Sequence, residues 1–81
     1  MSPTSHFRAY ILIETSVAQT GLVAEALRKL EVVTSVHKVT GPYDIVAFLE
    51  ANDPSTVGEA VIEKIRPIEG ITRTLTCVVL D

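Results

Sequence analysis

The chain has 81 residues, of which 47% are hydrophobic and 21% charged, and its formal net charge at pH 7 is −3. This length predicts one domain, because a second hydrophobic core would need about 50 further residues. The seven basic residues are scattered, which argues against direct binding to DNA. Apolar runs are far shorter than the roughly 20 residues that span a membrane, and the N-terminus does not resemble a signal peptide. We therefore expect a cytoplasmic protein.

Self-association is predicted because so small a domain needs stabilisation from disulfides, metals or partners. Cys77 is the only cysteine, and no second thiol or histidine lies near it at metal-ligand spacing. The sequence contains no phosphate loop, metal cluster or nucleophile motif, so we expect no cofactor and no catalytic residues. The high apolar content instead predicts apolar surface that a second copy would bury.

Six elements are predicted in chain order, beginning with a strand over residues 8–14. Apolar side chains on both faces of this strand are typical of a central position in a sheet. An amphipathic helix follows over residues 19–30. Its apolar stripe consists of Leu22, Val23, Ala26, Leu27 and Leu30. Residues 32–40 are rich in β-branched side chains and half polar, as in an edge strand.

The second half repeats this order after a turn at residues 41–42. Residues 44–50 are apolar on both faces and predict a second central strand. Asp53 and Pro54 begin a helix, because Asp caps free N–H groups and Pro fits the first turn, and Pro67 ends it. The predicted buried stripe consists of Val57, Val61, Ile65 and Ile68.

The last predicted strand covers residues 70–80 and completes an α+β, ferredoxin-like βαββαβ order. This topology predicts a four-stranded antiparallel sheet whose first and third strands are central. Both helices would pack on one face through right-handed crossovers. The other face is apolar and would be buried by a second copy across a two-fold axis, as in a dimeric α+β barrel.

Two motifs define a family resemblance. Residues 41–44 read Gly-Pro-Tyr-Asp, and residues 70–76 read Gly-Ile-Thr-Arg-Thr-Leu-Thr. With the element order, these motifs resemble the RAM, or ligand-binding, domain of the Lrp/AsnC family of feast/famine transcriptional regulators. We expect an N-terminal tail over residues 1–7 and a RAM-type domain over residues 8–81. Full-length members carry a helix-turn-helix domain before the RAM domain. The sequence resembles the family's stand-alone members, so no direct DNA binding is expected.

The resemblance implies dimers that assemble into rings of dimers, with full-length Lrp/AsnC regulators as further partners. It also implies an amino acid effector bound at the interfaces between dimers. Residues that match the family motifs and are therefore predicted to bind the ligand are Gly41, Tyr43, Asp44, Thr74, Thr76, Cys77 and Val78. A carboxylate can hold an ammonium group, and turn N–H groups or threonine hydroxyls can hold a carboxylate.

Several alternatives remain open at this stage. The Asp44 carboxylate could have no role beyond accepting hydrogen bonds from amides of its own turn, and Gly41 could be required for a positive φ angle. Tyr43 could anchor an interface, and Cys77 could be a small buried hydrophobe. The domain could also be an oligomerisation partner without an effector. A small dimeric α+β barrel enzyme would instead use His37, with the tyrosine and aspartate of the turn, as acid and base groups.

Overall fold

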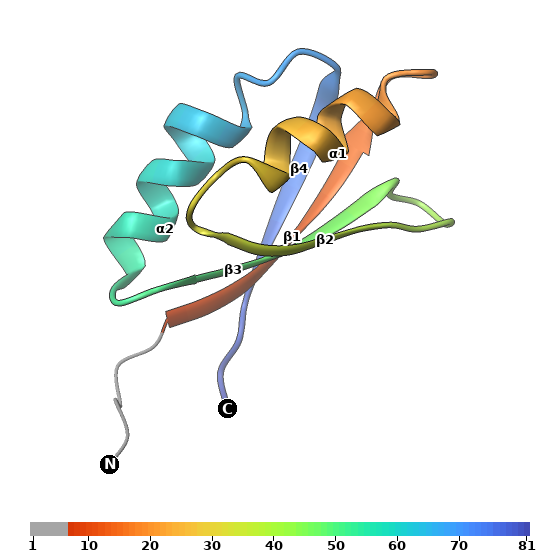
Figure 1. Ribbon diagram of the computed structural model, residues 1–81. Coiled ribbons are helices and arrows are strands. Elements are labelled where there is room, and N and C mark those ends of the chain that lie inside the picture. Colours follow the sequence, from red (N-terminus) through yellow and green to blue (C-terminus); the bar gives the residue numbers. More distant parts are fainter. Residues whose placement is uncertain (1–6) are drawn as a thin grey trace.

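The computed structural model describes residues 7–81 and confirms the βαββαβ order (Figure 1). The second helix is α-helical in its first half and continues as a π-helical turn. The elements are β1 (Phe7–Thr15), α1 (Thr20–Arg28), β2 (Val33–Lys38), β3 (Ile45–Ala51), α2 (Pro54–Ala60), η1 (Val61–Ile65) and β4 (Ile71–Val78). No helix of the described residues is long and apolar enough to cross a membrane.

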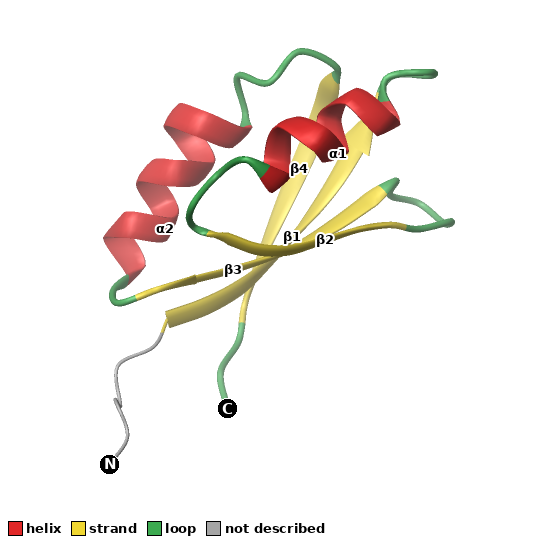
Figure 2. Cartoon of the chain, in the orientation of Figure 1, coloured by secondary structure: helices red, strands yellow, loops and turns green. Residues whose placement is uncertain are grey.

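The four strands form one antiparallel sheet in the order β2-β3-β1-β4, which confirms that β1 and β3 are central. Ile11 of β1 lies opposite Ala47 of β3 on one side and Thr76 of β4 on the other. Both helices cover the same face of this sheet, as Figure 2 shows. The chain therefore has a helix face and an open face.

The core lies between the helices and the sheet and is formed by alternate residues of the central strands. Residues with no exposed surface are Ala9, Ile11, Ile13, Val23, Ala24, Leu27, Ile45, Ala47, Leu49 and Ile65. The predicted stripe of the second helix is confirmed at Val57, Val61 and Ile65. The prediction for Leu22 is wrong, because its side chain is 66% exposed. The first helix begins at Thr20 and turns Val23, Ala24 and Leu27 toward the sheet instead.

Several element ends differ from the predicted ranges for local reasons. Helix α1 ends at Arg28 because the next two N–H groups bond carbonyls only three residues back. Strand β2 is shorter than predicted, and its register with β3 shifts between Val33 and Ser35, as at a β-bulge. Strand β1 begins at Phe7, one residue before the predicted range, because that residue pairs with Ala51 and packs against the core.

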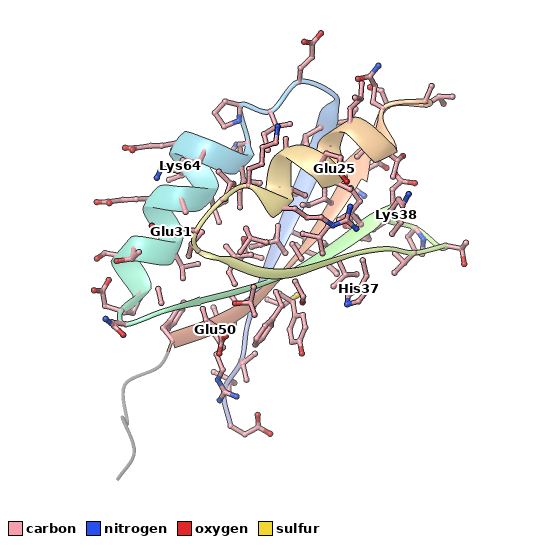
Figure 3. The ribbon with its side chains drawn as sticks, viewed as in Figure 1. Glu25, Glu31, His37, Lys38, Glu50 and Lys64 are labelled. Carbon is pink, nitrogen blue, oxygen red and sulfur yellow. The ribbon has the colours of Figure 1, made fainter. Side chains whose placement is uncertain are left out.

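The open face of the sheet is apolar at its centre. It is formed by Tyr10, Leu12, Val46, Phe48, Leu75 and Cys77. The rings of Tyr10 and Phe48 contact each other with centroids 4.8 Å apart. Tyr10 is 44% exposed and Leu75 is 47% exposed, so the open faces of β1 and β4 are not covered within one chain. Polar side chains border this area, and Figure 3 shows His37 and Glu50 projecting on the side away from the helices.

Candidate functional site

The turn between β2 and β3 lies at the end of the sheet where β1 ends and β4 begins. Gly41 has a φ angle of 138°, a conformation that side-chain-bearing residues rarely adopt. A Cβ atom at Gly41 would meet no atom within 4 Å, so the backbone conformation and not crowding requires glycine. The alternative reading of Gly41 as a backbone requirement is confirmed.

The carboxylate of Asp44 ties this turn to the end of β1. Its Oδ2 accepts a hydrogen bond from the backbone N–H of Thr15 at 2.8 Å and lies 3.3 Å from the Thr15 hydroxyl. The backbone N–H of Asp44 donates to the carbonyl of Ile13 at 2.9 Å. The carboxylate therefore bonds the neighbouring strand, and the alternative reading that it serves amides of its own turn is wrong. The other oxygen, Oδ1, has no hydrogen-bond partner within residues 7–81.

Thr15 extends this link to the first helix. The hydroxyls of Thr15 and Thr20 lie 2.7 Å apart and share a hydrogen bond. Thr20 is the first residue of α1, so a short chain of bonds joins the turn, the end of β1 and the start of α1. Asp44 thus has a structural role that its sequence motif does not reveal, because Thr15 lies 29 residues earlier in the chain.

Tyr43 connects the same turn to β4. The guanidinium carbon of Arg73 lies 5.6 Å from the centre of the Tyr43 ring, which is a cation–π distance. Arg73 is not among the predicted site residues. Strand alternation could have indicated it, because Arg73 precedes Leu75 and Cys77 by even steps along one strand.

The predicted residues of β4 divide between the two faces of the sheet. Thr74, Thr76 and Val78 lie opposite buried residues of β1 and so share the helix face. Cys77 lies opposite Tyr10 and belongs to the open face, where it is exposed. The six residues from Arg73 to Val78 span about 17 Å of strand. Within one chain, the turn therefore meets only the start of β4.

Two hollows lie beside the second helix. The first, about 600 Å³, is lined by α2, η1 and the end of β3, and contains none of the predicted site residues. Its acidic residues are Glu31, Glu50, Asp53, Glu59 and Glu63. The second, about 520 Å³, lies between η1 and β4 and is called the basic groove below. Its lining includes Val61, Arg66, Thr72, Arg73, Thr74 and Thr76. Within the described residues, no group of acidic, histidine and cysteine side chains could hold a metal ion.

Comparison with known protein families identifies the class of protein that this fold defines. The model of the Lrp/AsnC ligand binding domain matches residues 8–81, which confirms the resemblance found in the sequence. The chain therefore belongs to the Lrp/AsnC ligand-binding domain family, whose members include transcriptional regulators.

Two curated relatives contain this domain as part of a longer chain. An uncharacterized HTH-type transcriptional regulator of Pyrococcus furiosus is 43% identical over 56 residues, which are 69% of this chain and 37% of the regulator. A homocitrate synthase of Sulfurisphaera tokodaii is 34% identical over 79 residues, which are 96% of this chain and 17% of the enzyme. The chain spans less than two fifths of the length of either relative.

Solved structures show the same fold. TTHA0845 from Thermus thermophilus is 32% identical, with a TM-score of 0.88 and coverage of 93% of this chain and 94% of that chain. AsnC from E. coli is 26% identical, with a TM-score of 0.87 and coverage of 93% and 51%. A transcriptional regulator of Neisseria meningitidis, solved as a complex with L-Met, is 21% identical, with a TM-score of 0.83 and coverage of 93% and 50%.

Proposed function

We propose that this domain is a non-catalytic, effector-sensing module that assembles with copies of itself and binds an amino acid between dimers. It would act on transcription through regulators that contact DNA. The family to which the chain belongs is described as a ligand-binding domain, and a neighbour in fold was solved with L-Met, which supports an amino acid as the ligand class.

The open face is the observation that supports assembly most directly. Two cross-strand rows cover it: Tyr10 lies between Phe48 and Cys77, and Leu12 lies between Val46 and Leu75. Charged residues border these rows at both ends. Arg8 lies opposite Glu50 on the neighbouring strand, and Glu14 lies opposite Arg73. An apolar centre with aromatic rings and a polar rim is the usual composition of a protein interface. A second copy, related by a two-fold axis, would present the same rows to it.

The effector surface that we propose lies where the turn of one dimer meets β4 of the next. Gly41, Tyr43, Asp44, Thr74, Thr76 and Val78 would contribute to it, whereas the predicted site residue Cys77 lies in the row with Tyr10 that a dimer would bury. The Oδ1 atom of Asp44 has no partner among the described residues and could accept a bond from an ammonium group. Contributions from different copies are required because, within one chain, most of the β4 residues lie far along the strand from the turn.

One observation favours a second candidate. The similarity to a segment of a homocitrate synthase, 17% of that enzyme, suggests that such a domain can sense an effector on behalf of an enzyme. The reading of the domain itself as an enzyme has less support. No hydrogen bond joins His37 to Tyr43 or Asp44 within residues 7–81.

Native mass spectrometry and a thermal-shift panel of the twenty amino acids test this proposal. We expect wild-type masses at multiples of 8.8 kDa and a rise in the unfolding midpoint with one or a few amino acids. Phe48→Asp should yield monomers, because it places a charge in the centre of the open face. Leu22→Asp is the matched control, since Leu22 is exposed on the helix layer and should leave assembly unchanged.

A wild-type monomer at micromolar concentration would contradict self-assembly. A panel without any shift would contradict effector sensing and favour an oligomerisation partner without an effector.

A further inference from the structure

The basic groove differs from the rest of the molecule in its charge. The chain has ten acidic and seven basic residues, yet within residues 7–81 the groove lining contains Arg66 and Arg73 and no carboxylate. The guanidinium of Arg73 lies over the Tyr43 ring, so Arg66 is the cation that faces the groove. The other hollow, beside the same helix, is lined by five of the ten acidic residues. One side of the second helix therefore carries five carboxylates and Lys64, whereas the groove side carries Arg66 without a lining carboxylate, which favours an anion as its ligand.

The π-helical turn η1 places Arg66 at this groove. The N–H of Arg66 donates to the carbonyl of Val61 at 2.9 Å, five residues back. In an α-helix of 3.6 residues per turn, residues five apart point about 140° away from each other. The wider turn brings them to the same side, and Val61 and Arg66 both line the groove. Turns of this kind are rare in proteins, and many of those that are found lie at functional sites.

Hydrogen-bond donors lie across the groove from Arg66. Thr74 and Thr76 are alternate residues of β4 on the helix face, and their hydroxyls make no hydrogen bond within residues 7–81. Thr72 is already engaged, because its hydroxyl donates to the carboxylate of Glu14 at 2.9 Å. Arg66 is exposed, and the one ion pair among the described residues joins Arg28 to Glu25.

We propose that the basic groove binds a small anion through a carboxylate or phosphate group. The guanidinium of Arg66 faces the oxygens of the anion, and the hydroxyls of Thr74 and Thr76 donate to them. The proposal goes beyond amino acid sensing, because it assigns Arg66 and η1 a role and does not require that the ligand carry an ammonium group. It shares the two threonines with the proposed effector surface.

Isothermal titration of the full chain with malonate and with inorganic phosphate tests the site. We expect saturable binding of at least one of the two, and the tighter one identifies carboxylate or phosphate as the preferred group. Arg66→Gln should weaken that binding about ten- to hundred-fold, the range expected when a charged hydrogen-bond partner is lost. Thr76→Val, which keeps the shape of the side chain, should weaken it several-fold.

The control is Lys29→Gln, which removes one positive charge from a residue outside the groove lining and should leave affinity within about two-fold. Thermal unfolding verifies that each variant is folded, as expected for substitutions at exposed positions.

Absence of saturable binding to both anions would overturn the inference, and so would equal weakening by Arg66→Gln and Lys29→Gln. Neither result affects assembly or the amino acid panel, so the two proposals fail separately.

Discussion

Substitution of Asp44 separates its structural role from its proposed contact with an ammonium group. Asp44→Asn keeps a carbonyl oxygen that can accept the Thr15 N–H, which the carboxylate now accepts at 2.8 Å. Asp44→Ala removes that acceptor and leaves a half-buried N–H without a partner. We expect a loss of unfolding free energy of about 1 to 3 kcal/mol for Asp44→Ala, and of about 1 kcal/mol for Asp44→Asn, which loses only the charge.

Binding should respond differently from folding. Both variants lose the negative charge, so both should bind the amino acid that gives the largest thermal shift roughly ten- to hundred-fold more weakly, equivalent to about 1.5 to 3 kcal/mol. Glu59→Gln removes a negative charge from an exposed position outside the turn and serves as the control. Chemical denaturation measures stability, isothermal titration measures affinity, and native mass establishes that all forms assemble alike.

Equal affinity of wild type and Asp44→Asn would refute the proposed role of Asp44 in the site. A stability loss of Asp44→Asn as large as that of Asp44→Ala would refute the structural reasoning, because the amide would then have failed to replace the bond to Thr15.

Three further predictions concern the folded chain alone. Gly70→Ala should lower the unfolding free energy by about 1 to 3 kcal/mol, because φ is 103° and a Cβ would lie 2.9 Å from the Cβ of Gln19. Gly58→Ala, in a helix with open space around it, should instead raise it by about 0.5 to 1 kcal/mol in the same denaturation assay. Hydrogen bonds from the backbone and side chain of Thr56 and from Ser55 lower the pKa of Asp53 below 3.8. A lowered pKa stabilises the fold at pH above 3.8, and this contribution disappears as the pH falls through the folded value. The unfolding midpoint should therefore decrease less on acidification below pH 3.8 in Asp53→Asn than in wild type, and equal decreases would contradict this assignment.

The topology could be predicted because its determinants are local. Apolar residues on both faces of two strands indicated that those strands are central, and the sheet order confirms this. Asp53 and Pro54 began the second helix as expected, with the Asp53 carboxylate accepting the Thr56 N–H at 2.9 Å. Periodicity was less reliable for the narrow stripe of α1, where a shift of one residue exposes Leu22.

The contacts of the candidate site could not be predicted in the same way, because they join distant parts of the chain. Asp44 and Thr15 are 29 residues apart. The contact between Tyr43 and Arg73 depends on the pairing of β1 with both β3 and β4, which brings the turn and β4 to the same end of the sheet. The π-helical turn has no sequence signature, since residues 61–65 fit an α-helix equally well. The π-helical turn is shown by the bond from the Arg66 N–H to the Val61 carbonyl, and the position of Arg66 beside β4 is shown by the lining of the basic groove.

The bonds around the turn indicate how an effector would act. Asp44 fixes the turn to β1, and Tyr43 contacts Arg73 of β4. The loop that follows β1 is held as well, because the Ser16 N–H donates to the Gly70 carbonyl at 2.8 Å. Three segments at this end of the sheet are thus joined within one chain, and a ligand has little freedom to reshape any of them singly. Since a ligand shifts an equilibrium only by its differential affinity for two states, the proposed effector would have to distinguish two arrangements of whole copies.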